Sequence, residues 1–420
     1  MISAALGRRA LLPALAVVTA AIAGQGAAAV GLSEQPSLFD TPGGLKQGLR
    51  DAGIELDVWL TNVNQGILSG AGDKTWQSGT KADVIATFDG QRLGLWDGLY
   101  VNLHQDVVWG NDANNQRDGS ILPVNVVLGF PRLGGDEAET SITVTQVFGP
   151  RLSVSAGKFN LLDSAARTPI AGGGGWQTFL HTGLAAPISG VTPPYLFGTI
   201  VSYKADSFSS TLMIYDPRNA QDNRVITDPF EDGVTASLSL AFPLQLNGMA
   251  GSLSVRGVFS SQDGLDFTTL PDILLPPEAQ NLSYQDNYLF ASVSAQQYLW
   301  QDSANPAVGW GVFAQASVSD GNPNSIGWSV LGGIGGTGGL GGRDNDKWGV
   351  GFFHYAFSTD LKDGLDALGV TLEDESGVET FYNLAITPWW RVSANLQVIN
   401  PATDGAPRAV SGAIRTQIKF

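Results

Sequence analysis

The chain has 420 residues, of which 43% are hydrophobic and only 15% charged, and its formal net charge is −16 at pH 7. The acidic excess argues against a nucleic-acid partner, because binding to phosphates requires clustered Lys and Arg. The absence of cysteine excludes disulfides, thiolate catalysis and cysteine-ligated metal centres. The 53 glycines and 21 prolines indicate many short strands joined by turns.

Residues 1–29 have the organisation of a secretory signal peptide. Arg8 and Arg9 supply the positive charge, residues 10–23 are apolar, and Ala27 and Ala29 suit a small-residue cleavage site. We therefore expect an exported protein that is cleaved near Ala29. A helical membrane anchor is the alternative, but the apolar stretch is too short to span a bilayer core of about 30 Å. No later segment is an apolar run of about 18 residues, so only a closed barrel would keep the exported chain in a membrane.

Residues 30–53 form the next predicted unit, a periplasmic segment with a short helix. Leu45, Leu49 and Ala52 share one helical face within residues 44–52, and Gly53 is suited to end the helix. The remaining residues, 54–420, form the third unit.

From Ile54 onward the hydrophobic pattern has a period of two, which predicts β-strands. The ranges 54–61, 80–89 and 99–106 each place their charged residues on one face and apolar residues on the other. A soluble sandwich would alternate in the same way. An outer-membrane barrel is favoured, with its apolar face toward lipid and its polar face toward the lumen, because the chain lacks a second, fully buried set of strands.

Thirteen further strands are predicted at 140–148, 151–158, 197–204, 207–215, 234–241, 250–261, 287–299, 308–319, 325–333, 348–358, 379–387, 390–399 and 409–420. The total of sixteen is even, as single-chain bacterial barrels require. Long outer connections alternate with short periplasmic ones, except for a short outer turn near Asp320-Gly321 and a Gly-rich periplasmic connection at 334–347. The chain ends on an amphipathic strand at Phe420, a pattern typical of the signal read by the barrel-insertion machinery.

Four stretches resemble the carbohydrate-selective porins of the OprB type. They are residues 43–54, Gly157-Lys158-Phe159 with Asp163, residues 311–324, and Thr387-Pro388-Trp389 with Asn400-Pro401 and Arg415-Thr416. The resemblance spans about residues 43–420 and implies a sixteen-stranded barrel that admits mono- and small oligosaccharides by diffusion. Two departures leave the substrate preference open: Asp40-Thr41-Pro42 replaces the usual Gly-Asp-Trp, and Gln315 stands where the family has Arg.

The candidates for contact with a solute are polar or aromatic residues on the predicted lumenal faces. On the strands they are Glu55, Asp57, Trp59, Lys81, Asp83, Asn102, His104, Asp106, Arg256, Arg391, Gln397 and Arg415. The long connection 159–196 adds Asp163, Arg167 and Trp176, if it folds into the lumen as a constriction and not outward as an extracellular cap. Ordinary wetting of the lumen is the alternative role for each of these residues.

No cofactor, metal or enzyme activity is expected. Residues 333–338 match G-x-G-x-x-G, but no helix follows, so a turn is favoured over a dinucleotide site. The three histidines stand in no catalytic motif. Small sugars and outer-membrane lipid are the expected partners. A general or cation-preferring porin and a plugged structural or adhesin barrel remain as alternatives, and a homo-oligomer is left open.

Overall fold

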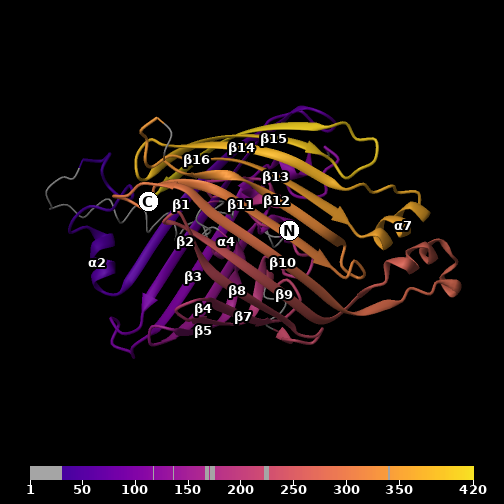
Figure 1. Cartoon of the computed structure of the whole chain (residues 1–420), viewed down its shortest axis with the longest axis horizontal. Coiled ribbons are helices and arrows are strands. Elements are labelled where there is room, and N and C mark those ends of the chain that lie inside the picture. The colour runs from indigo at the N-terminus through magenta and orange to yellow at the C-terminus, as the bar shows by residue number, and fades with distance from the viewer. Residues whose placement is uncertain are drawn as a thin grey trace, which may run out of the picture.

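The computed structural model describes residues 31–116, 118–135, 137–165, 170, 176–221, 227–338 and 341–420. The predicted signal peptide lies outside these residues. In the described chain, sixteen antiparallel strands form one closed barrel, in which β1 pairs with both β2 and β16. Figure 1 shows this barrel from the side, with α2 near one end and α7 near the other. The predicted fold class is confirmed.

The strands follow one another around the barrel in chain order. They are β1 (Ile54–Ser69), β2 (Gln77–Asp89), β3 (Leu99–Gly110), β4 (Ala138–Phe148), β5 (Leu152–Asn160), β6 (Tyr195–Lys204), β7 (Ser209–Tyr215), β8 (Thr235–Leu246), β9 (Met249–Leu265), β10 (Tyr284–Gln301), β11 (Gly309–Ser319), β12 (Ile326–Thr337), β13 (Lys347–Phe357), β14 (Glu375–Ala385), β15 (Trp390–Asn400) and β16 (Ala409–Lys419).

Alternation along the strands separates two chemically different faces. On β14, Glu375, Glu379 and Phe381 point inward and are buried, whereas Val378 between them is 46% exposed. Bulky apolar residues such as Phe352 and Ile414 are exposed on the outer face of other strands in the same way. A soluble protein would not tolerate an apolar surface of this extent, whereas lipid requires it.

Several helices lie at the two ends of the barrel. Helix α2 (Leu45–Asp51) runs between Gly44 and Ala52, as predicted, and Gly53 follows it with a φ of +88°. The η5 (Phe267–Leu274), η6 (Pro277–Ala279) and α7 (Thr359–Ala367) helices lie in two long outer connections, in which η5 contacts α7. No helix in the described residues is long and apolar enough to cross a membrane.

Short turns join the strands at the end of the barrel near α2. The tightest joins β8 to β9 through Asn247 and Gly248, whose φ values are +52° and +80°. An Asn-Gly pair with positive φ at both positions matches the right-handed twist of the flanking strands. The alternation of short and long connections is as predicted.

One predicted connection is wrong. The Gly-rich run after Gly333 continues β12 as far as Thr337 and pairs with β11 and β13, so the G-x-G-x-x-G match lies largely in a strand and not in a turn. The neighbouring strand β13 needs glycine for another reason, because the connection between β5 and β6 packs directly against it. A Cβ added at Gly351 of β13 would lie 3.0 Å from Leu184 and 3.1 Å from Phe179.

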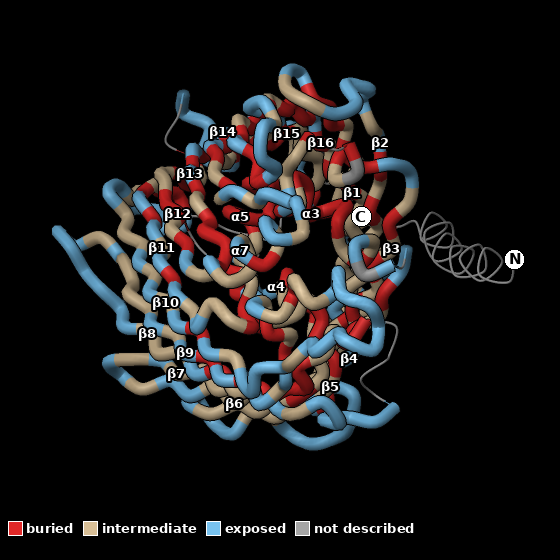
Figure 2. Tube along the Cα trace, turned by 90° about the vertical axis from the view of Figure 1, so that its right-hand side faces the viewer, coloured by how far each residue is buried: buried red, intermediate tan, exposed pale blue. Residues whose placement is uncertain are grey.

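Two of the outer connections fold back into the barrel, and we call them the first inner loop (residues 111–137) and the second inner loop (residues 161–194). The first contains η2 (Ala113–Asn115), α3 (Val126–Gly129) and η3 (Arg132–Gly134), and the second contains α4 (Leu161–Ala165) and α5 (Thr182–Ala185). Figure 2 shows α3, α4 and α5 within the ring of strands. The second loop therefore adopts the lumenal alternative, and the inward course of the first loop was not predicted.

The inner loops and the wall share one hydrophobic core. Phe179 contacts Phe313 of β11 and Phe381 of β14, with ring centroids 5.9 Å and 4.9 Å apart. The loops also bond to each other, since Val126 N donates to Leu180 O at 2.8 Å and Thr182 N donates to Pro123 O at 2.9 Å. This core fills the side of the barrel formed by β11 to β16 and β1.

Candidate functional site

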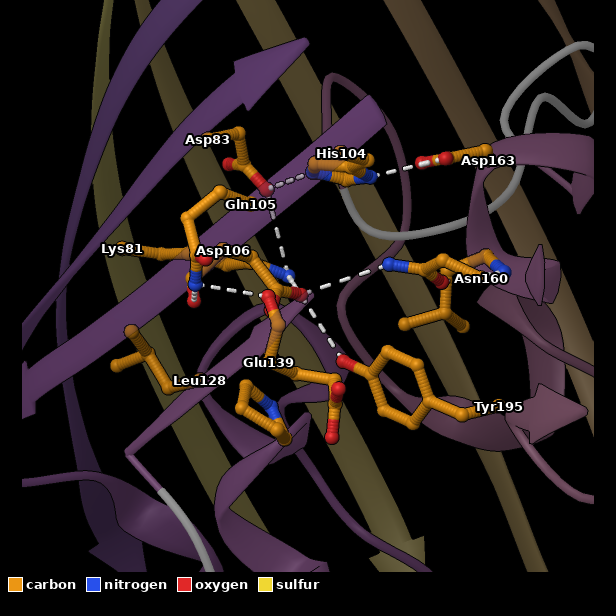
Figure 3. Close-up of polar contacts among 12 residues, drawn as sticks. Lys81, Asp83, His104, Gln105, Asp106, Leu128, Glu139, Asn160, Asp163 and Tyr195 are labelled. Carbon is orange, nitrogen blue, oxygen red and sulfur yellow. Dashed lines mark hydrogen bonds and ion pairs between the residues drawn. The ribbon is translucent and has the colours of Figure 1, made fainter. Parts of the chain in front are cut away.

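A buried ionic cluster lies on the lumenal face of β2 and β3 (Figure 3). Lys81 Nζ is 3.0 Å from Asp106 Oδ2 and 3.5 Å from Asp83 Oδ1. Lys81 and Asp83 are two residues apart on β2 and therefore share its lumenal face. Asp83 pairs across the strands with Asp106 of β3. None of the three residues is more than 3% exposed. A charge in such a position is tolerated only when partners compensate it, and here one ammonium group lies between two carboxylates.

His104 extends the cluster to the second inner loop. Its Nε2 is 3.0 Å from Asp83 Oδ1, and its Nδ1 is 2.9 Å from Asp163 Oδ2 on α4. Because a carboxylate accepts on either side, the ring makes both contacts only when both nitrogens carry protons. The strand wall and the loop are therefore joined through a histidine that bridges two carboxylates.

Four further polar residues, which the sequence analysis did not single out, complete the cluster. The Tyr195 hydroxyl donates to Asp106 Oδ2 at 2.9 Å, and the Asn160 amide donates to the same oxygen at 3.5 Å. Next to them, Lys158 forms an ion pair with Glu139. Lys158 belongs to the Gly-Lys-Phe motif, so that motif was the one available signal for its role.

Three members of the cluster have the donor atoms of a metal site. The ligand atoms of Asp83, His104 and Asp106 all lie within 4.8 Å of one another. The ammonium group of Lys81, however, already lies beside both carboxylates. A divalent cation would have to displace Lys81, so the geometry fits an internal ion-pair network better than a metal centre.

An aromatic group adjoins the cluster. The rings of Trp59 and Trp176 meet edge to face with centroids 5.6 Å apart, and Trp176 lies 6.4 Å from the His104 ring. Lys419 Nζ lies 5.0 Å above Trp59 and 2.8 Å from Asp57 Oδ1. A sugar offers C–H faces to such rings and hydroxyls to the charged groups beside them, so this combination is suited to sugar contact.

Two buried glutamates on β14 hold the inner loops. Glu379 accepts hydrogen bonds from Leu180 N at 2.7 Å and from His181 N at 2.9 Å. Four residues earlier on the same face of β14, Glu375 accepts hydrogen bonds from Ile121 N at 2.7 Å and from Leu122 N at 3.3 Å. Each inner loop thus has its own carboxylate, which satisfies backbone donors that would otherwise be buried without partners.

The side of the barrel that the hydrophobic core does not fill contains a cavity of about 820 Å³. One of its walls is the second inner loop. The opposite wall consists of β8 to β11. Beside the apolar Phe290 and Phe313, this wall presents the polar side chains of Ser239, Ser252, Ser254, Ser292, Ser294 and Gln296. Arg256 lies among them.

A family profile described as carbohydrate-selective porin, OprB family, matches residues 81–420, which is most of the chain. The protein belongs to this family. It is therefore an outer-membrane porin for carbohydrates, in agreement with the resemblance seen in the sequence.

Solved porin structures share the fold of this OprB-family chain. The high-pH structure of Pseudomonas putida OprB superposes with a TM-score of 0.79 at 19% identity, over 93% of this chain and 100% of that one. Its low-pH structure gives 0.53 at 15% identity, over 92% and 99% of the two chains. Salmonella typhi OmpF, in a complex with daunomycin, gives 0.53 at 10% identity, over 88% and 98%. A search of curated protein sequences found no match.

Three further candidate residues lie apart from the cluster of this OprB-family porin, and a fourth is not described. Glu55 is exposed at the start of β1, and Asn102 accepts a hydrogen bond from Thr87 at 2.8 Å. Arg391 donates to Asn383 Oδ1 at 2.8 Å near the turn that precedes β13. Arg167 lies outside the described residues.

Two candidates are covered, and for them the expectation of an open pore-lining position is corrected. Gln397 donates to Val124 O at 2.9 Å, and Arg415 donates to Thr178 O at 2.9 Å. Both side chains point toward the lumen, but the inner loops lie over them, and they are at most 1% exposed. In this OprB-family porin they hold the loops in place and do not face the solute.

The sequence analysis missed the two glutamate anchors. Glu375 was assigned to a connection, because the predicted strand began only at residue 379. Residues 375, 377, 379, 381 and 383 share one face of β14, so the alternation already reached back to Glu375. For the first inner loop, the apolar run Val126-Val127-Leu128 was the available signal, since it is more apolar than an exposed loop requires.

Proposed function

We propose that this porin passes mono- and small oligosaccharides by passive diffusion, without turnover chemistry, along the cavity between the second inner loop and the β8–β11 wall. The observation that carries the proposal is the hydroxyl-rich wall of that cavity. Its volume lies in the range of about 300–1,000 Å³ that is usual for sites of small molecules. Serine and glutamine side chains exchange hydrogen bonds with sugar hydroxyls without the desolvation that a buried charge would add.

We propose further that sugars contact the ionic cluster and its aromatic neighbours on the β1–β3 side of the lumen. Trp176 is the candidate stacking face, and Asp163 and His104 are the nearest polar groups. The support is their mutual contact, in which Trp176 lies 6.4 Å from His104 and His104 lies 2.9 Å from Asp163.

Single-channel conductance in a planar bilayer tests these two proposals. With glucose, maltose and longer maltodextrins titrated in, we expect a stable conductance that sugars block saturably. Trp176→Ala is expected to weaken the block roughly threefold to tenfold, because an aromatic contact of this kind contributes on the order of 1 kcal/mol. The control is Trp328→Ala, which removes a lipid-facing ring that is 48% exposed. Conductance that is indifferent to every sugar would contradict the proposed path.

We also propose that residues 1–29 are a signal peptide removed near Ala29, that residues 30–53 stay in the periplasm, and that the barrel-insertion machinery reads the end of β16. The contacts of Phe420 where β16 meets β1 support this proposal. Its N–H donates to Val58 O at 2.8 Å, its backbone carbonyl accepts from Lys46 Nζ at 2.7 Å, and its ring lies 5.8 Å from Phe39.

Deletion of Phe420 is expected to lower the amount of protein in the outer membrane of cells while leaving the refolded channel nearly intact. The register between β1 and β16, from Trp59↔Lys419 to Ser69↔Val410, does not depend on this residue. Heat-modifiable gel mobility of membrane fractions measures assembly, and planar-bilayer conductance measures the refolded protein. Phe420→Trp, which keeps a terminal aromatic side chain, should assemble normally. Equal loss in cells and in refolding would show that Phe420 acts on stability alone.

A further inference from the structure

Arg256 stands in the middle of the hydroxyl-rich wall. On β9 it pairs across the sheet with Ser239 of β8 on one side and Ser292 of β10 on the other, and all three line the 820 Å³ cavity. Among the described residues that line this cavity, Arg256 is the one with a charged side chain. Within the described lining, the guanidinium group is therefore the one source of formal charge.

The partners of this guanidinium are neutral. Arg256 Nε donates to Ser237 Oγ at 2.9 Å, and Nη2 donates to Thr192 Oγ1 at 2.8 Å on the second inner loop. No ion pair joins Arg256 to a carboxylate of the described residues. The contrast with Lys81 is clear, since two carboxylates lie within 3.5 Å of that ammonium group. The charge of Lys81 is thus compensated by two carboxylates, whereas the charge of Arg256 is not compensated by a carboxylate of the described residues.

We propose that the cavity selects monosaccharides that carry a carboxylate, that is, sugar acids of the aldonate or uronate type, over neutral sugars of the same size. This inference rests on the proposed function, in which the cavity is the diffusion path. A planar guanidinium matches a carboxylate with two parallel donors, and the bond is charge-assisted. The flanking serines can accept and donate to the remaining sugar hydroxyls, as they would for a neutral sugar.

The positive charge of Arg256 also counteracts the effect of the negative net charge of the chain on anionic solutes. Its net charge of −16 disfavours anions at the pore mouth. A cation inside the cavity that pairs with no carboxylate of the described residues offsets part of this repulsion. A sugar acid is thus held by Arg256, whereas a neutral sugar gains little from it.

The competing role for Arg256 is purely mechanical, since its bond to Thr192 also fixes the second inner loop. Three variants separate the two roles. Arg256→Gln removes the charge, and Arg256→Lys keeps the charge but not the planar fork. Thr192→Val keeps Arg256 and removes the loop hydroxyl that bonds to Arg256 and to Tyr215. Heat-modifiable gel mobility verifies that each variant is folded.

The experiment measures the block of single-channel current by glucuronate and by glucose, at constant ionic strength, for the wild type and the three variants. We expect Arg256→Gln to weaken the glucuronate block roughly tenfold, the loss typical of one charge-assisted bond, and to change the glucose block little. Arg256→Lys should keep much of the preference, and Thr192→Val should keep nearly all of it.

Equal losses of both blocks in Arg256→Gln, or the same loss of preference in Thr192→Val, would overturn the inference and leave Arg256 as a loop clamp. Failure of the proposed function gives a different result. In that case glucose would not block the wild-type channel at all, while a glucuronate block that depends on Arg256 would still support the anion-selective cavity.

Discussion

A Glu375→Ala/Glu379→Ala double variant is expected to conduct more current than the wild-type porin and to admit larger maltodextrins. The two carboxylates accept at least five hydrogen bonds, from four backbone N–H groups of the inner loops and from Asn395 Nδ2. A buried donor left without an acceptor costs about 1–3 kcal/mol. The double variant therefore loses on the order of 5 kcal/mol or more of loop anchoring.

The hydrophobic core opposes release of the second inner loop. Phe179, Leu180 and Leu184 are buried against the wall, and each contributes about 1.5–3 kcal/mol. The loss of one carboxylate is comparable with this packing, so the single variants should keep a mostly closed pore. Only the double variant removes enough anchoring on both loops to shift the population toward an open lumen.

Planar-bilayer conductance and liposome swelling with maltodextrins of increasing length measure this opening. The matched control is Glu231→Ala/Glu278→Ala, which removes the same two charges from outer connections, where Glu231 is exposed and η6 holds Glu278. Unchanged conductance and an unchanged size limit in the anchor variant would show that the inner loops do not narrow the pore.

Lys81→Met is expected to be the most destabilising single substitution in the lumen. It leaves Asp83 and Asp106 facing each other at the place where Lys81 Nζ now lies 3.5 Å and 3.0 Å from their oxygens. Removal of one partner from a buried ionic group typically costs about 3–5 kcal/mol, because the remaining charge is uncompensated. Denaturant unfolding of the refolded protein in lipid or detergent measures this loss.

Two comparisons identify the uncompensated charge as the cause. Lys419→Met removes a cation that is paired with Asp57 but whose side chain is 24% exposed, and it should cost about 1 kcal/mol or less. Adding Asp83→Asn and Asp106→Asn to Lys81→Met should restore much of the stability, because the two carboxylates that faced Lys81 are then neutral and His104 keeps Asp163 as its partner. If the triple variant were no more stable than Lys81→Met, lost packing of the lysine side chain would be the cause instead.

The barrel itself could be predicted from the sequence because its signal is local. In the first three strands, alternation already separated Lys81, Asp83, His104 and Asp106 from the lipid-facing residues, and each of these four lies inside the barrel. The sequence also indicated the number of strands, the alternation of short and long connections, and the family. A period of two needs only neighbouring residues, so no contact between distant segments has to be known.

The interior could not be predicted, because it depends on pairs of residues far apart in the chain. Glu379 holds Leu180 across 199 positions, and Arg415 holds Thr178 across 237. The alternation correctly turned Gln397 and Arg415 toward the lumen, but it carried no information about the loops that cover them. The same applies to β12, whose glycines resemble a turn but pair with β11 and β13, and to Gly349 and Gly351 of β13, which make room for Phe179 and Leu184.

The sequence by itself thus determined the wall of this porin, and the tertiary structure decided its contents. The wall follows from the requirement that lipid imposes on every strand, namely an apolar outer face and paired backbone groups. What lies inside the barrel depends on which loops form hydrogen bonds and hydrophobic contacts with the lumenal face of the wall. Buried carboxylates and gaps left by glycines hold the inner loops on one side of the lumen, and the side they leave open is lined by serines around Arg256.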